Sequence, residues 1–185
     1  MDGFLKAIIV IVLLSVIGIC AIILSISITK KKQLKKMDDD VHNVLEKIVS
    51  SSNEEYFLKK EENNVYDYTL DTPTTTFYIK IVPNLSNEEI CVNNSVKWQL
   101  RKSFNDESLR FVNDIEGLMR LDIESNKIIK KVFLVYPNTR SLLKYINECE
   151  MVFIYPKTDV YGSNIITYRQ LEENPDLLKS LQEEI

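Results

Sequence analysis

Glycine and histidine are scarce in this chain, and their scarcity excludes several kinds of site. The 185 residues include four glycines and one histidine. No stretch is rich enough in glycine for a phosphate-binding loop. The three cysteines, Cys20, Cys91 and Cys149, form no CxxC pair or His/Cys cluster that could bind zinc. His42 lies near the charged start of a predicted helix, so we expect it on the surface and exclude histidine-based catalysis.

Charge of one sign is not in excess, which argues against a strongly basic nucleic-acid-binding protein. Lysine and arginine number 23 against 27 aspartates and glutamates, giving a net charge of -4. Any nucleic-acid site would therefore have to be local. The chain is 45% hydrophobic and 27% charged, which is typical of a globular protein and not of a disordered one.

A long hydrophobic run is present near the N-terminus. Residues 7–28 read AIIVIVLLSVIGICAIILSISI and contain no charge. As a helix this run would span about 33 Å, enough for a hydrocarbon core of about 30 Å. We therefore expect a transmembrane helix inserted in the lipid bilayer. A cleaved signal peptide ending near Ser25-Ile26-Ser27 is the alternative, but the run is longer than a usual signal-peptide core.

A basic stretch directly after this run predicts its orientation. It contains Lys30, Lys31, Lys32, Lys35 and Lys36. The positive-inside rule then places the following domain in the cytoplasm and the short N-terminus outside. The same lysines would lie beside anionic lipid headgroups. The predicted segments are a tail (1–6), a transmembrane helix (7–28), a basic juxtamembrane collar (29–37) and a soluble domain of about 150 residues, the usual size of one compact unit (38–185).

The first part of the soluble segment predicts a helix followed by strands. Apolar residues at three- and four-residue spacing predict a helix over residues 37–49, with Asp38, Asp39 and Asp40 at its N-terminus. Strands are expected over residues 56–58, 65–70, 75–82 and 89–92. Helices are expected over residues 96–103, after Asn94-Ser95 as the N-cap, and within residues 109–121.

The clearest pattern lies further along the chain. Residues 130–136 predict a buried strand ending at Pro137, and residues 151–155 predict a second one. Between them, Asn138 or Thr139 would cap a helix reaching about Cys149. This unit favours a parallel strand pair with a right-handed crossover. With a short strand over 165–168 and a helix over 177–184, the fold class expected is a three-layer α/β domain with one mixed sheet.

Polar residues interrupt two of the apolar strands. Asp67 lies within the first strand of a predicted hairpin, Lys80 lies within the second, and Gln99 lies on the helix expected after Asn94-Ser95. The three could converge beside one face of the sheet. There the aspartate could hold a divalent cation and the lysine could position a water near a phosphodiester. The alternative is structural, with Asp67 exposed, Lys80 extended to solvent and Trp98 in the core.

This order of elements resembles the PD-(D/E)xK nuclease-like, or restriction-endonuclease-like, fold. Over residues 38–156 the chain looks most like the nuclease-related domain, NERD. The resemblance implies that Asp67 is the metal-binding aspartate, Lys80 the catalytic lysine and Gln99 the helix glutamine, with Mg²⁺ as the metal of an active enzyme. Tyr78 stands where the family has a second acidic ligand. The resemblance therefore implies a catalytically degenerate domain.

Three functions follow from these observations. The first is a membrane-anchored cytoplasmic domain that binds or scaffolds a protein or nucleic-acid partner. The second is an active metal-dependent nuclease near the membrane. The third is an outward-facing viral or bacterial envelope protein, for which the signs would be glycans at Asn84 or Asn93 or a disulfide between Cys91 and Cys149.

Overall fold

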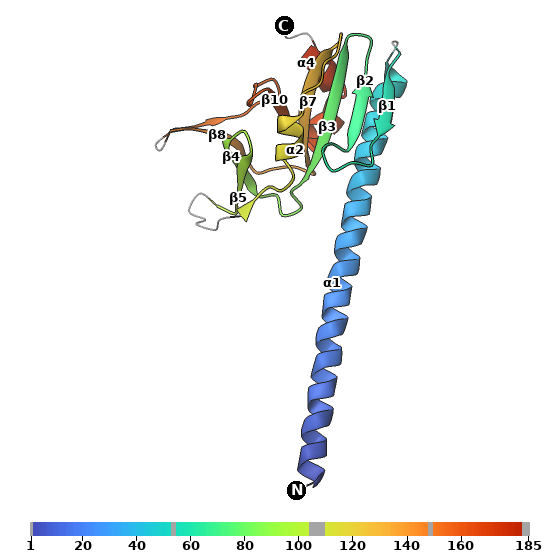
Figure 1. Ribbon diagram of the computed structural model, residues 1–185, viewed down its shortest axis with the longest axis vertical. Helices are drawn as coiled ribbons and strands as arrows, with labels where there is room; N and C mark the ends of the chain where they lie inside the picture. Colours follow the sequence, from blue (N-terminus) through green and yellow to red (C-terminus); the bar gives the residue numbers. More distant parts are fainter. Residues whose placement is uncertain (1, 53–54, 104–109, 148–149, 183–185) are drawn as a thin grey trace. The chain divides into compact units, whose positions relative to one another are not determined.

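The computed structural model describes residues 2–52, 55–103, 110–147 and 150–182. The chain divides into two compact units, residues 1–40 and residues 41–185. Helix α1 (Asp2–Ser51) forms the first unit and continues into the second. The second unit is an α/β domain with two mixed sheets of five strands each (Figure 1).

The first unit is an apolar helix long enough to cross a bilayer. Among the described residues, α1 is the one helix that meets this requirement by length and composition. Its most apolar stretch has a mean hydropathy of 2.2, and none of that stretch is buried. The predicted helix boundary before Asp38 is wrong, because Asp38, Asp39 and Asp40 lie in the interior of α1. The collar contains no glycine or proline and is rich in lysine, so nothing in it ends the helix.

The first sheet of the domain combines a hairpin with parallel strands. Its spatial order is β1 (Phe57–Lys60), β2 (Tyr68–Asp71), β3 (Thr75–Pro83), β7 (Ile128–Tyr136) and β10 (Ser163–Thr167). Strands β1, β2 and β3 pair antiparallel, whereas β7 lies parallel to both β3 and β10. In this register Ile79 of β3 lies opposite Val132 of β7.

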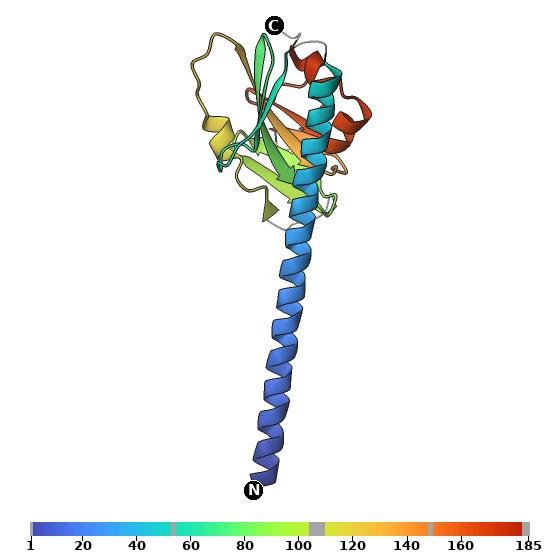
Figure 2. The same cartoon turned by 90° about the vertical axis from the view of Figure 1, so that its right-hand side faces the viewer.

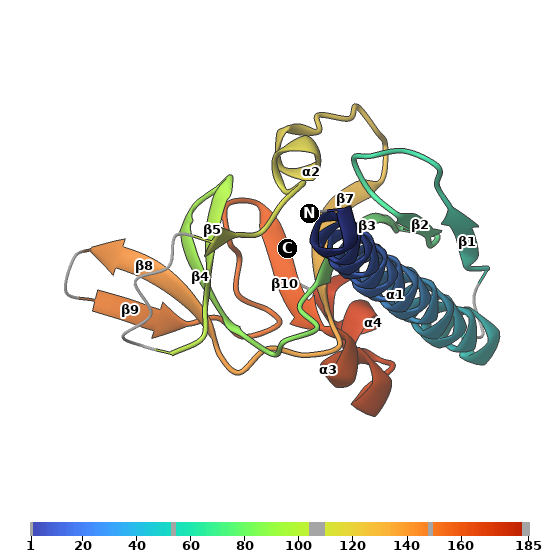
Figure 3. The same cartoon turned by 90° about the horizontal axis from the view of Figure 1, so that it is seen from below.

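The second sheet has its own parallel pair. Its spatial order is β6 (Arg110–Phe111), β5 (Lys97–Arg101), β4 (Glu89–Asn94), β8 (Leu142–Asn147) and β9 (Glu150–Phe153). Strands β4 and β8 are parallel, and the other neighbours are antiparallel. Figure 3 shows β8 and β9 side by side, next to β4 and β5.

Helices cover one face of the first sheet. The apolar side chains of Phe77, Ile79, Val132 and Leu134 are buried and alternate with those that face the other way. Helix α3 (Tyr168–Glu173) contacts β7 and β10, and it also contacts α4 (Leu177–Gln182). Figure 2 shows these red helices and the blue-green end of α1 on one side of the sheet, with the yellow helix α2 (Glu116–Arg120) on the other.

The second sheet covers part of the opposite face. Val82, Phe133 and Val135 of the first sheet form one buried cluster with Ile90 and Trp98 of the second. The rings of Trp98 and Phe133 lie 4.7 Å apart, centre to centre. The second half of strand β7, residues 132–136, is therefore buried on both faces, which explains its apolar run.

Two predicted helices are strands, and this changes the architecture. Residues 97–101 form β5 and residues 142–147 form β8, so the predicted strand–helix–strand unit is wrong. The parallel partners of β7 are β3 and β10, and β8 lies in the other sheet. The expected mixed sheet is present, but there are two, and the layers are helices, first sheet and second sheet.

Other predicted elements are confirmed with shifted ends. The strands expected over 75–82, 89–92 and 165–168 are β3, β4 and β10, and the helix expected within 109–121 is α2. The terminal helix is α4, which ends at Gln182, and residues 183–185 lie outside the described part of the chain.

Candidate functional site

The part of the first sheet that the second sheet leaves uncovered is polar. Along β3, Val82 packs between the sheets, and Lys80, Tyr78 and Thr76 follow it on the same face. Asp71 on β2 lies opposite Thr76. A cavity of about 440 Å³ opens here, which we call the polar pocket. It is lined by Phe57, Lys59, Glu61, Tyr66, Thr69, Asp71, Thr76 and Tyr78.

Asp71 is held as a carboxylate at one side of the polar pocket. Its oxygens accept hydrogen bonds from the Lys127 ammonium at 2.8 and 2.9 Å and from the Thr76 hydroxyl at 2.7 Å. Burial alone would raise the pKa of Asp71, but the hydrogen bonds from Lys127 and Thr76 outweigh it and hold the pKa below its ordinary value. Lys127 also donates to the carbonyl oxygen of Thr72 at 2.7 Å, so this corner is fixed.

Glu61 and two tyrosines line the rest of the polar pocket. The ammonium of Lys59 lies 2.8 Å from Glu61 Oε1 and donates a hydrogen bond to Glu61 Oε2 at 3.1 Å. This hydrogen bond raises the pKa of Lys59. Tyr66 and Tyr78 meet edge to face with their ring centres 4.8 Å apart. Burial, followed by the neighbouring Tyr66 and then the carboxylates of Asp71 and Glu61, raises the pKa of Tyr78. The Tyr78 phenol therefore remains a protonated hydrogen-bond donor at neutral pH.

Asp67 and Lys80, predicted from sequence to act together, do lie together. Lys80 Nζ is 3.5 Å from Asp67 Oδ1 and donates to the carbonyl oxygen of Asn64 at 3.2 Å. Asp67 Oδ2 accepts from the backbone N–H of Ile81 at 2.6 Å. Asp67 precedes β2, so it is not within a strand as predicted. Both side chains therefore hold the segment before β2 against β3.

Gln99 does not join this pair. It lies on strand β5 of the second sheet, where a helix was predicted. Its neighbours Trp98 and Leu100 pack into the cluster between the sheets, so the alternation of a strand directs Gln99 to the outer face. On that face it lies opposite Cys91 of β4 and Phe111 of β6.

No metal centre is formed by the part of the chain that the structure describes. Within it, no three His, Cys, Asp or Glu side chains are grouped so that they could share an ion. Asp67, the predicted metal ligand, has the Lys80 ammonium beside it. Tyr78, at the position of the family's second acidic ligand, lines the polar pocket. The arrangement offers hydrogen-bond donors and acceptors for recognition.

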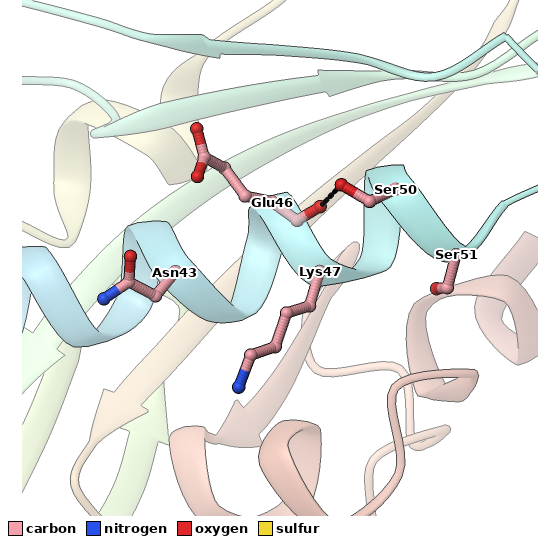
Figure 4. A pocket seen from close by; sticks show the side chains of 5 residues that line it. All are labelled: Asn43, Glu46, Lys47, Ser50 and Ser51. Atoms are coloured by element: carbon pink, nitrogen blue, oxygen red, sulfur yellow. Dashed lines mark hydrogen bonds between the residues drawn. The ribbon is translucent and has the colours of Figure 1, made fainter.

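A larger hollow lies along the end of α1, but its side chains do not form a binding or catalytic site. It measures about 660 Å³ and is lined by Asn43, Glu46, Lys47, Ser50 and Ser51, all from one helix (Figure 4). Figure 4 shows the side chains of Glu46 and Lys47 pointing away from each other. The Ser50 hydroxyl donates to the backbone carbonyl of Glu46 at 2.8 Å, as is common within a helix. These groups do not converge on a ligand.

His42 is only partly on the surface. Its ring stacks on Tyr68 with the centres 5.9 Å apart, and its Nε2 lies 3.1 Å from Glu46 Oε1. Neither neighbour is a nucleophile, so the ring has a packing role.

The asparagine and the cysteine that could carry a glycan and a disulfide in an outward-facing protein, Asn84 and Cys91, are both buried. Asn84 is 4% exposed, and its amide nitrogen donates to the carbonyl oxygens of Glu88 and Asn138. A glycan on that nitrogen would break this arrangement. Cys91 is a buried free thiol, and Cys149 lies outside the described residues.

The polar pocket was missed by sequence reasoning, although a signal was present. Polar residues alternate with core residues in β2 and β3. The strand expected over residues 65–70 would have placed Tyr66 and Tyr68 on the same face. The structure places Tyr68 in the core and Tyr66 at the pocket.

Comparison of the chain with family models, with curated proteins and with solved structures finds no match.

Proposed function

We propose that the chain is a single-pass membrane protein whose α/β domain is a cytoplasmic binding or scaffolding module. The apolar stretch of α1, none of which is buried, carries the anchor part of this proposal. An apolar surface of that length is stable in a bilayer and not in water. The lysines that follow favour the cytoplasm for the domain.

The polar pocket supports binding over catalysis. Asp71 and Glu61 each lie 2.8 Å from a lysine ammonium, so both carboxylates already have a cationic partner. The Tyr78 phenol stays protonated. Carboxylates and phenols at the pocket, in a chain of net charge -4, favour a protein segment over the phosphates of a nucleic acid.

A cysteine-labelling experiment tests the anchor and its orientation. Lys179→Cys places a thiol on an exposed position of α4, with Cys20 and Cys149 replaced by serine. Cys91 is buried and can stay in place. We expect a membrane-impermeant maleimide to label this variant only after intact cells are permeabilised. The chain without Lys179→Cys is the matched control and should not be labelled in either case.

Thiols introduced near the two ends of the chain distinguish the two orientations of the anchor. A thiol introduced at Gly3→Cys should be labelled in intact cells if the N-terminus is outside. Labelling of Lys179→Cys in intact cells would reverse the orientation and favour the envelope function. A mature chain that lacks residues 1–27 and is released from the membrane would show that the apolar stretch is a signal peptide.

The second candidate function is a metal-dependent nuclease of the NERD type. The contact between Asp67 and Lys80 is the observation that favours it. The full chain would be incubated with supercoiled DNA and with RNA in Mg²⁺ or Mn²⁺. Cleavage that Lys80→Ala abolishes, while the fluorescence of Trp98 stays native, would establish this function. We expect wild-type protein to leave both substrates intact, which would reject it.

A further inference from the structure

Strand β9 forms an open edge of the second sheet and exposes apolar side chains. It is the last strand in the sheet and pairs with β8 alone among the described strands. Phe153 is 62% exposed and Val152 is 38% exposed, and on β8 Ile146 is 52% exposed. Figures 1 and 3 show this hairpin extending from the rest of the sheet. Such an edge is a template for pairing with another strand.

The hydrogen bonds between β8 and β9 show which backbone groups face the open edge. The N–H of Ile154 donates to the carbonyl oxygen of Leu142 at 2.9 Å, so Ile154 points toward β8. Backbone direction alternates along a strand. The N–H and C=O groups of Met151 and Phe153 therefore point away from β8. They are available to a further strand.

The other sheet edges are protected in ways that β9 is not. Strand β1 carries Lys59 and Lys60, and edge lysines oppose strand addition. Every residue of β10 is buried, and β6 is only two residues long. Strand β9 reads Glu-Met-Val-Phe and has no lysine.

We propose that β9 pairs antiparallel with β9 of a second copy of this chain, so that two second sheets join into one sheet. The two-fold axis passes between the two copies of Val152. Met151 then lies opposite Phe153 of the other copy, and both exchange backbone hydrogen bonds. The two exposed Phe153 side chains come to lie on one face of the joined sheet, each between Leu143 of its own copy and Met151 of the other.

This register explains why a second copy fits the edge. It uses the outward backbone groups of both Met151 and Phe153. Glu150, the one charged residue of β9, falls opposite the apolar Ile154, so like charges do not meet across the interface. If the chain is anchored as proposed above, its copies share one membrane plane, which raises their effective concentration.

Cross-linking at the two-fold axis tests the proposal on the full chain in detergent micelles, independently of topology. Directly opposite residues of a non-hydrogen-bonded pair have Cα atoms about 4.5 Å apart, within the range that a disulfide bridges. With Cys20 and Cys149 replaced by serine, we expect Val152→Cys to oxidise to a covalent dimer of twice 21.5 kDa. Lys59→Cys on the edge of the first sheet is the matched control and should remain a monomer.

A charged residue at position 152 should weaken the dimer without weakening the β8–β9 hairpin. In the monomer, Val152→Glu lies opposite Lys144 of β8, which favours the hairpin. In the dimer, two carboxylates meet at the axis. We expect the dissociation constant, measured by sedimentation in micelles, to rise about five- to tenfold. Val152→Thr should change it little, and a mixture of Val152→Glu with Val152→Lys should restore association.

Three results would overturn the proposal. The first is a wild-type chain that stays monomeric at all concentrations. The second is a dimer that Val152→Glu leaves intact, which would assign association to another surface. The third is equal cross-linking from Val152→Cys and Lys59→Cys, which would indicate random collision within a micelle.

Discussion

The Asn84 side chain ties together two of the four segments by which the chain crosses between the sheets, and its removal should be costly. One of them, residues 84–88, joins β3 to β4, and the other, residues 137–141, joins β7 to β8. Asn84 Oδ1 accepts from the N–H of Glu88 at 3.0 Å. Its Nδ2 donates to the carbonyl oxygens of Glu88 at 2.8 Å and Asn138 at 3.0 Å.

The structure gives the expected size of the effect. Asn84→Ala removes three hydrogen bonds at a buried position, and each contributes about 1 kcal/mol net. The carbonyl oxygen of Glu88 keeps a bond from the Thr139 hydroxyl at 2.6 Å, so it is not left unsatisfied. We therefore expect the free energy of unfolding to fall by about 3 kcal/mol.

Urea unfolding of the full chain in micelles measures this change. Trp98 is the only tryptophan and is fully buried, so its fluorescence reports the domain and not the apolar helix. The midpoint should fall while the slope with urea stays constant. Asn113→Ala, at an exposed position, is the control and should have little effect. A loss below about 0.5 kcal/mol for Asn84→Ala would refute the argument, because it is the size expected of an ordinary surface change.

Other substitutions give separate tests. Asp71→Asn should lower stability by about 0.5–1 kcal/mol at pH 7, because the pair with Lys127 is more than one third exposed. The pKa of Asp71 in the folded protein lies below 3.8. The stabilisation that the Asp71 carboxylate provides is therefore present above that pH and is lost as the pH falls through the folded pKa. The acid unfolding curves of the wild-type protein and of Asp71→Asn should then converge at low pH. The buried Cys91 thiol, whose pKa is raised by burial, should react with a thiol reagent only when the domain unfolds, and reaction at the rate of the unfolded chain would contradict its placement. Gly162→Ala should cost about 1 kcal/mol in the same urea assay, because Gly162 has φ of 80° with open space around it, and an unchanged midpoint would count against that conformation.

The sequence predicted the two long strands of the first sheet. Strands β3 and β7 are rich in β-branched and aromatic residues, interrupted only by lysines, and both were placed within a few residues. The apolar helix at the N-terminus was also clear from composition, since its length without a charge has few explanations.

The errors arose where a polar residue supported two structures. Asn94 was taken as a helix cap, and its Oδ1 does accept a backbone hydrogen bond, from Val96 at 3.0 Å. That bond closes a turn between β4 and β5. Thr139 was likewise taken as a possible cap, but its hydroxyl donates to the carbonyl oxygen of Glu88 at 2.6 Å, with the carbonyl oxygen of Ser141 also nearby at 2.9 Å. Short polar side chains cap turns and helices alike, so local sequence could not separate the two.

The β8 strand was misread because its apolar residues lie on both faces. Leu142, Leu143, Tyr145 and Ile146 fit a helical spacing as well as a strand.

The candidate site was predicted only in part. Asp67 and Lys80 meet because they belong to one hairpin region, which sequence can show, whereas Gln99 was assigned to the site through a helix that does not form.

The parallel pairs have a consequence for the order in which the domain can be built. Strand β3 cannot pair with its parallel neighbour until β7 has been synthesised, and the same holds for β4 and β8. In these pairs Ile79 lies opposite Val132 and Ile90 lies opposite Leu142. Both sheets therefore depend on contacts between residues far apart in sequence, which is the high contact order associated with slow folding. During synthesis the apolar helix and the first six strands leave the ribosome before either sheet can be completed. Until β7 and β8 follow, β3 and β4 each keep one edge open, beside a membrane surface if the apolar helix is inserted.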